Sequence, residues 1–133
     1  MRNKEISLKE KLKQALSSTV RVISDDLFTN ENIKNKKNWK KQDFFELDKI
    51  NDKNDFIKAR AETDSSALKK KFSNENIYRK NLPSNSSTKS LYSIAEKIRY
   101  ETLGGKMLIG IKKNFEDNYN QIINSKKKDQ LNT

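Results

Sequence analysis

Apolar residues recur at three- and four-residue intervals along much of the chain, a spacing typical of helices that bury one face. The pattern predicts a first helix over residues 7–24, with Ser7 as its cap. It predicts a second helix over residues 52–72, capped by Asp52 or Asn54. The apolar stripes of these two helices are Leu8, Leu12, Leu16, Val20 and Ile23, and then Ile57, Ala61, Leu68 and Phe72.

Two more helices are predicted in the second half of the chain. The run from Pro83 to Ser87 is a loop signal, after which Ser87 or Thr88 caps a third helix. The pair Gly104-Gly105 breaks or kinks the pattern, and a fourth helix follows it. The expected apolar faces are Leu91, Ile94, Ala95 and Ile98 in the third helix, and Leu108, Ile111, Phe115, Tyr119 and Ile122 in the fourth.

The segment between the first two helices has no regular pattern. Residues 25–51 are rich in lysine and asparagine, and we expect a long irregular insertion there with room for one or two short strands. The polar residues 125–133 are expected to form a disordered tail. The sequence therefore predicts a mainly α fold: a single small domain of about four helices over residues 1–124.

Composition narrows the possible chemistry. The 133 residues are 32% hydrophobic and 35% charged, so the core must be thin. The chain has no cysteine and no histidine, which excludes disulfides and thiolate sites and removes the commonest general base. We therefore assign no catalytic residue and no metal ligand. The start of the chain is charged and no apolar run is long enough to span a membrane, so we expect a cytoplasmic protein without membrane contact.

The net charge of +11 raises the possibility of a nucleic-acid partner. Five lysines surround Trp39 within residues 32–41, and one interpretation is a basic patch with Trp39 stacked on a base. The other is a solvated lysine-rich loop, which we favour. The sequence Gly104-Gly105-Lys106 lacks the spacing of a phosphate-binding loop.

One acidic residue interrupts an apolar stripe. Asp64 lies between Ala61 and Leu68, where a carboxylate is costly unless it has a partner. Arg60 is four residues earlier and can pair with it along the helix. Arg99 borders the apolar face of the third helix. We therefore predict an interhelical ion pair between an acid of the second helix and Arg99.

These charged positions lie in two motifs with a family resemblance. Residues 60–68 resemble an arginine-x-glutamate-alanine-aspartate run followed by alanine-leucine. Residues 95–111 resemble a glutamate-x-x-arginine-x-glutamate-x-x-glycine run that continues into a methionine and a second glycine. Residues 12–21 resemble the first helix of the same family more loosely. The family is the N-terminal region of the CobT subunit of the aerobic, ATP-dependent cobaltochelatase.

The resemblance implies a function. Such a complex inserts cobalt into a corrin precursor during cobalamin biosynthesis; a large subunit holds the tetrapyrrole, and an AAA+ ATPase drives the reaction. The CobT subunit couples the two, so the chain is expected to be a non-catalytic assembly module. It would bind no cofactor itself, while the complex would use ATP, Mg²⁺ and Co²⁺. The alternative is a stand-alone basic nucleic-acid-binding or regulatory protein.

The resemblance also selects residues. They are candidates for contacts between helices or with a partner subunit: Arg60, Glu62, Asp64, Glu96, Arg99, Glu101, Gly104, Met107 and Gly110. The family's C-terminal von Willebrand A domain, with its magnesium-dependent adhesion site, has no counterpart in this sequence. Asp64-Ser65-Ser66 does not continue as a D-x-S-x-S motif, because residue 68 is leucine. We therefore expect a truncated form of the subunit.

Overall fold

A computed structural model of the protein describes residues 2–24 and 50–132. It contains five helices in these residues: α1 (Arg2–Ile23), α3 (Lys53–Phe72), α4 (Glu75–Lys80), α5 (Ser86–Met107) and α6 (Ile109–Leu131). No strand occurs within this part of the chain, so the predicted mainly α fold is confirmed. The short strands expected in the insertion, and the lysine-rich stretch around Trp39, lie outside the described residues.

The start of α3 agrees with its predicted cap, whereas two other helix starts differ. The side chain of Asp52 accepts a hydrogen bond from the Asp55 amide at 2.8 Å, as an N-cap does. Helix α5 is capped by Asn85, whose side chain accepts from the Ser87 amide at 2.9 Å, and not by Ser87 or Thr88. Helix α1 begins at Arg2 instead of residue 7, because the residues before Ser7 include no helix breaker.

The second half of the chain is more helical than predicted. The expected loop holds the six-residue helix α4, which is too short to show a periodic pattern. Helix α5 continues through Gly104-Gly105 to Met107, and the break comes at Leu108, which has an extended backbone. Helix α6 reaches Leu131, so most of the tail predicted to be disordered is helical; no glycine or proline follows Gly110 to stop it.

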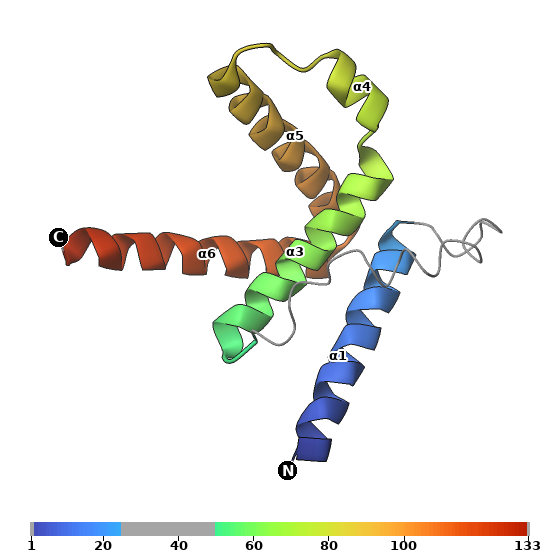
Figure 1. Cartoon of the computed structure of the whole chain (residues 1–133), viewed down its shortest axis with the longest axis vertical. Coiled ribbons are helices and arrows are strands. Elements are labelled where there is room, and N and C mark those ends of the chain that lie inside the picture. The colour runs from blue at the N-terminus through green and yellow to red at the C-terminus, as the bar shows by residue number, and fades with distance from the viewer. Residues whose placement is uncertain (1, 25–49, 133) are drawn as a thin grey trace.

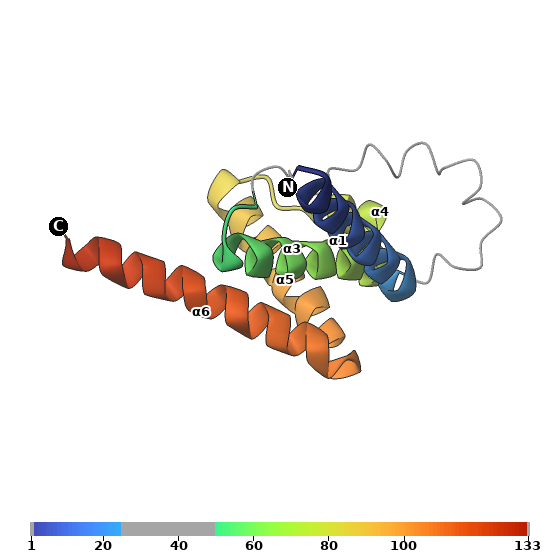
Figure 2. The ribbon, with the colours of Figure 1, turned by 90° about the horizontal axis from the view of Figure 1, so that it is seen from below.

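Helix α3 is the centre of the structure. It contacts α1, α5 and α6, and α5 also packs against α6 (Figure 1). Seen from below, α1 lies along one side of α3 while α6 runs out on another (Figure 2). Because α3 has neighbours on several sides, it buries small residues around much of its circumference. The buried core cluster comprises Val20, Ile23, Ala61, Ala67, Leu68, Tyr100, Ile111 and Phe115.

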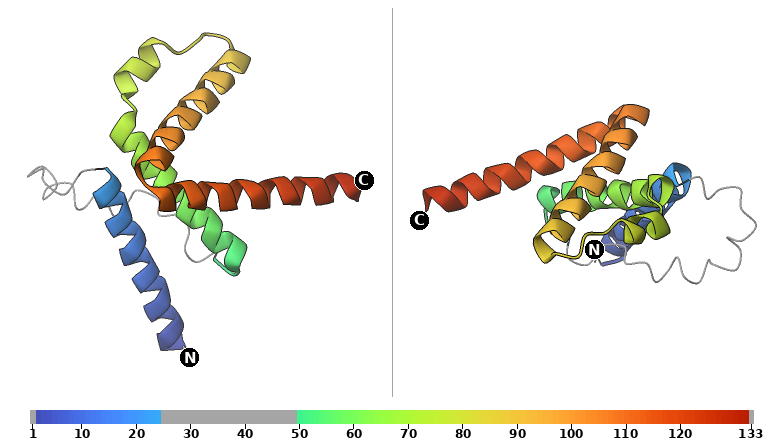
Figure 3. Two further views of the ribbon diagram at one scale, coloured as in Figure 1. Left: turned by 180° about the vertical axis from the view of Figure 1, so that it is seen from behind. Right: turned by 90° about the horizontal axis from the view of Figure 1, so that it is seen from above.

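The C-terminal half of α6 extends beyond the other helices, as both views of Figure 3 show. Ile111 and Phe115, near the start of α6, are buried as predicted. Tyr119 and Ile122, on the same face, are only partly covered because α6 leaves the core at this point. The predicted apolar face of α6 is therefore a core face for two turns only.

The predicted apolar face of α5 is wrong. Leu91, Ile94 and Ile98 are 66%, 54% and 58% exposed. The buried residues of α5 are Tyr100, Glu101 and Gly104. Gly104 explains this choice, because a Cβ at this position would overlap the side chain of Leu68 on α3. Only a helix surface without a side chain there lets α3 and α5 come so close.

Candidate functional site

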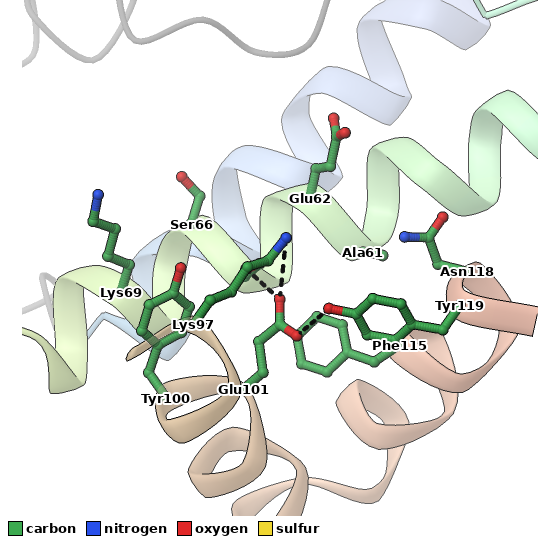
Figure 4. Close-up of a pocket in the computed structure, with 11 residues that line it drawn as sticks. Ala61, Glu62, Ser66, Lys69, Lys97, Tyr100, Glu101, Phe115, Asn118 and Tyr119 are labelled. Carbon is green, nitrogen blue, oxygen red and sulfur yellow. Dashed lines mark hydrogen bonds and ion pairs between the residues drawn. The ribbon is translucent and has the colours of Figure 1, made fainter. Parts of the chain in front are cut away.

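The predicted site residues of α3 and α5 lie around a hollow between α3, α5 and α6. Its volume is about 260 Å³, and residues of all three helices line it (Figure 4). Glu101 lies at its base and Glu62 at its edge, together with Lys69 and Lys97. Tyr100, Phe115 and Tyr119 supply aromatic walls. The hollow thus combines a buried carboxylate with charged side chains that face solvent.

The carboxylate of Glu101 links the three helices. Its residue is 7% exposed, and both of its oxygens accept hydrogen bonds. The Ser65 hydroxyl of α3 donates to Oε1 at 2.6 Å, and the Tyr119 hydroxyl of α6 donates to Oε2 at 2.6 Å. The Lys97 ammonium lies 3.9 Å from Oε1. Burial, together with the hydrogen bond to Glu101, raises the pKa of Tyr119 far above its usual value, so the phenol remains a donor.

Asp64 has a different partner from the one predicted. It is 3% exposed, and the Asn114 side-chain amide of α6 donates to its Oδ2 at 2.7 Å. Removal from water raises the pKa of Asp64, while the Asn114 hydrogen bond and the charge of Arg60 oppose the rise. An uncharged amide therefore satisfies the polar residue that interrupts the apolar stripe of α3.

Arg99 holds the C-terminal end of α3 against α5. Its Nη2 donates to the Phe72 carbonyl at 2.8 Å and to Glu96 Oε1 at 2.6 Å. The Ser73 hydroxyl donates to the same Glu96 oxygen at 2.9 Å. Hydrogen bonding with Arg99 lowers the pKa of Glu96, and that with Glu96 raises the pKa of Arg99. Arg99 thus uses a carbonyl that the end of α3 leaves without a helical partner.

The predicted ion pair between an acid of the second helix and Arg99 is therefore wrong. Asp64 lies eight residues before Phe72, which is about 12 Å along a helix axis. Asp64 faces α6, and Arg99 reaches only the end of α3. Asp64 and Arg99 therefore make separate contacts, Asp64 with Asn114 of α6 and Arg99 with the Phe72 carbonyl.

The nine candidate residues divide into two groups. Five make contacts between or within helices: Asp64, Glu96, Arg99, Glu101 and Gly104. The other four lie at the surface: Arg60, Glu62, Met107 and Gly110. Within the described residues, Glu62 forms a 3.9 Å ion pair with Lys58 of its own helix, and a Cβ on Gly110 would meet nothing within 4 Å.

Three functional partners were not predicted. Ser65, Asn114 and Tyr119 satisfy the buried acids, yet only Tyr119 had been placed on a core face, as an apolar residue. Ser65 had a visible signal, since it directly follows Asp64 on the helix that carries the first motif. Asn114 had none, because its partner lies 50 residues away in sequence.

The described residues were searched for metal-binding clusters and for membrane-spanning helices. No group of three or more carboxylates among them is placed to hold a metal ion. None of the helices in residues 2–24 and 50–132 is long and apolar enough to cross a lipid bilayer.

The fold and its contacts define an α-helical module in which two motifs, separated by residues 69–94, meet across α3 and α5. The chain matches the family described as cobalamin biosynthesis protein CobT over residues 7–133. The chain therefore belongs to the CobT family, as its motifs predicted, and this membership connects it with cobalamin biosynthesis. No curated protein and no solved structure matches it.

Proposed function

We propose that this chain is a non-catalytic assembly module of a cobaltochelatase complex, which inserts cobalt into a corrin precursor with the energy of ATP. The observation that carries the proposal is the family match, which extends over nearly the whole chain. The partners would be an AAA+ ATPase subunit and a large tetrapyrrole-binding subunit, in the cytoplasm. Cobalt would be cargo of the complex, and ATP and Mg²⁺ would bind to other subunits.

The division of the motif residues supports this role. The buried members fix α3, α5 and α6 relative to one another, so they make a rigid platform. Arg60 and Glu62 belong to the same motif but project from α3 to the surface. Rim charges of this kind govern partner choice and association rate more than they govern folding. We assign Arg60 and Glu62 to the contact with the ATPase subunit.

A pull-down with the AAA+ subunit, with and without ATP, tests the proposal. We expect association in at least one nucleotide state, and weaker retention after Arg60→Ala combined with Glu62→Ala. The matched control is Arg79→Ala with Glu75→Ala, which removes one arginine and one glutamate from the exposed surface of α4. No association in either state would overturn the proposal. Equal loss in both double variants would overturn the assignment of Arg60 and Glu62.

The net charge of +11 favours a second candidate function, the binding of nucleic acid. A gel shift at low salt with single- and double-stranded DNA and RNA addresses it. We expect no shift under conditions in which the ATPase subunit binds. A salt-sensitive shift without ATPase binding would favour the stand-alone nucleic-acid-binding alternative.

A further inference from the structure

The outward surface of α5 is an apolar stripe that no described element covers. It consists of Leu91, Ile94 and Ile98, which are spaced at three and four residues and lie on one side of the helix. Their exposed fractions exceed one half, whereas the large apolar side chains of α3 are buried or partly buried. We call these three residues the outer face of α5. A stripe of this kind is typical of a protein-binding surface.

The charges of α5 are distributed unequally around it. Its two acids, Glu96 and Glu101, turn towards α3 and are held there by hydrogen bonds. Its lysines, Lys89, Lys97 and Lys106, are all exposed. The surface of α5 therefore presents apolar side chains and positive charge, and its negative charge is directed inward.

A second hollow adjoins the outer face. It lies between α4 and α5, has a volume of about 480 Å³, and is lined by Tyr78, Leu82, Lys89 and Ile94 among others. Ile94 belongs to both the stripe and the hollow. The ring of Tyr78 on α4 packs against Tyr92 on α5 with centroids 5.1 Å apart. The stripe thus leads into a concave site with a lysine at its border.

We propose that the outer face of α5, together with this hollow, binds an acidic amphipathic helix of a partner protein. Apolar side chains of the partner would cover Leu91, Ile94 and Ile98, and one would enter the hollow. Carboxylates on its flanks would meet Lys97 and Lys106, which border the stripe on either side, and one that enters the hollow would meet Lys89. A second copy of this chain fits poorly, because its charge of +11 would repel an equal charge. The proposal holds whichever complex the chain joins.

Binding of a labelled synthetic peptide to the full chain tests this surface. The probe is a helical peptide with leucines at i, i+3, i+4 and i+7 and glutamates on its flanks, and the control peptide has lysines in their place. The variant Leu91→Gln/Ile94→Gln/Ile98→Gln should bind the acidic peptide at least about tenfold more weakly. The matched control is Leu8→Gln/Val22→Gln, which replaces exposed apolar residues of α1 and should bind normally; Leu8 is 66% exposed, like Leu91. Binding should weaken as salt is added.

Labelling of a single cysteine adds a second measurement, which reports directly on whether the outer face is covered. The natural chain has no cysteine, so Ile94→Cys provides one reactive thiol, with Leu8→Cys for comparison. We expect both to react readily with a maleimide, and the acidic peptide to slow only the first. The proposal is overturned if neither peptide binds, if both bind equally, or if Ile94→Cys is protected in the chain alone. Protection that grows with protein concentration would instead identify a second copy as the occupant.

Discussion

The two faces of α5 contradict the simple expectation that the more apolar face is buried. The inner face buries Tyr100, Glu101 and Gly104, and the outer face exposes Leu91, Ile94 and Ile98. The inner face has a carboxylate and lacks a side chain at one position. Position along the helix matters as well, because Ile94 lies two turns before Glu101 on nearly the same side, and all buried residues of α5 are in its second half. Burial of this helix therefore follows close fit and hydrogen-bond partners more than the hydrophobicity of the side chains.

Two physical terms explain the inner face. Gly104 lets Leu68 of α3 sit against the backbone of α5, so dispersion contacts form at a distance that a larger residue would prevent. A buried carboxylate is costly without partners, but Ser65 and Tyr119 donate to both oxygens of Glu101. The residues of the inner face stabilise the fold only together. Each can be tested by comparing its substitution with the same kind of substitution at an exposed position.

The largest effect is expected from filling the space at Gly104. Gly104→Leu should lower the free energy of unfolding by about 3 kcal/mol, because Leu68 is fully buried and has no room to move aside. Gly110→Leu is the matched control and should not lower it, since the position is open and leucine favours a helix more than glycine does. Urea denaturation followed by circular dichroism measures both. Equal changes at the two glycines would contradict the close packing of α3 on α5.

The next effect concerns the carboxylate at the base of the hollow. Glu101→Ala should cost about 2 kcal/mol, because hydrogen bonds to a charged group are lost and two hydroxyls lose their acceptor. Glu116→Ala removes a solvent-exposed acid with a 3.9 Å lysine partner and should cost less than about 0.5 kcal/mol. The same denaturation assay compares them. If the two variants are equally stable, Glu101 does not link the helices.

A smaller effect is expected at Asp64. Asp64→Ala should cost about 1 to 2 kcal/mol, because the Asn114 amide is left without its acceptor. Asp64→Asn retains an acceptor and should cost less at neutral pH. Thermal unfolding of both variants measures the difference. A loss of only a few tenths of a kcal/mol in Asp64→Ala would show that the contact with Asn114 adds nothing.

The same residue gives a dependence on pH. Folding raises the pKa of Asp64 above its usual value of 3.8. At pH values just above 3.8, the Asp64 carboxyl is therefore more often protonated in the folded protein than in the unfolded chain. The contribution of Asp64 to stability therefore decreases as pH rises through this window. Stability of the natural chain should fall relative to Asp64→Asn over that range and then run parallel to it. A constant difference from pH 3 upward would contradict the raised pKa.

The smallest effect is expected on the outer face. Leu91→Gln/Ile98→Gln should change the free energy of unfolding by less than about 0.5 kcal/mol, because these side chains are already exposed to water. Urea denaturation of the variant and of the natural chain, followed by circular dichroism, measures the change. A loss above about 2 kcal/mol would mean that the outer face is covered within the protein, and the comparison of the two faces would fail.

Much of the fold was predictable because helices are specified locally. Leu16, Val20 and Ile23 of the predicted stripe are the buried side of α1, and Asp52, one of the two predicted caps, marks the start of α3. The path of α5 past Gly104 was not predictable in the same way. Glycine weakens a helix locally, and only the packing of Leu68 against it compensates for that cost.

The residues of the two motifs could be identified from the sequence, but their contacts could not. The two motifs selected Asp64, Glu96, Arg99 and Glu101, all of which make polar contacts in the structure. Their partners come from distant segments or from the backbone, as with Asn114 and the carbonyl of Phe72. Sequence spacing cannot specify such pairs, because they depend on how the helices cross.

The sequence by itself determined the helical class, the absence of thiol and imidazole chemistry, and the family to which the chain belongs. These properties depend on residue type and short-range order. Only the tertiary structure decided which side of α5 meets α3 and which acids of the motifs are buried. The reason is that the choice between two faces of one helix rests on fit against its neighbours, and that fit involves residues up to 50 positions apart.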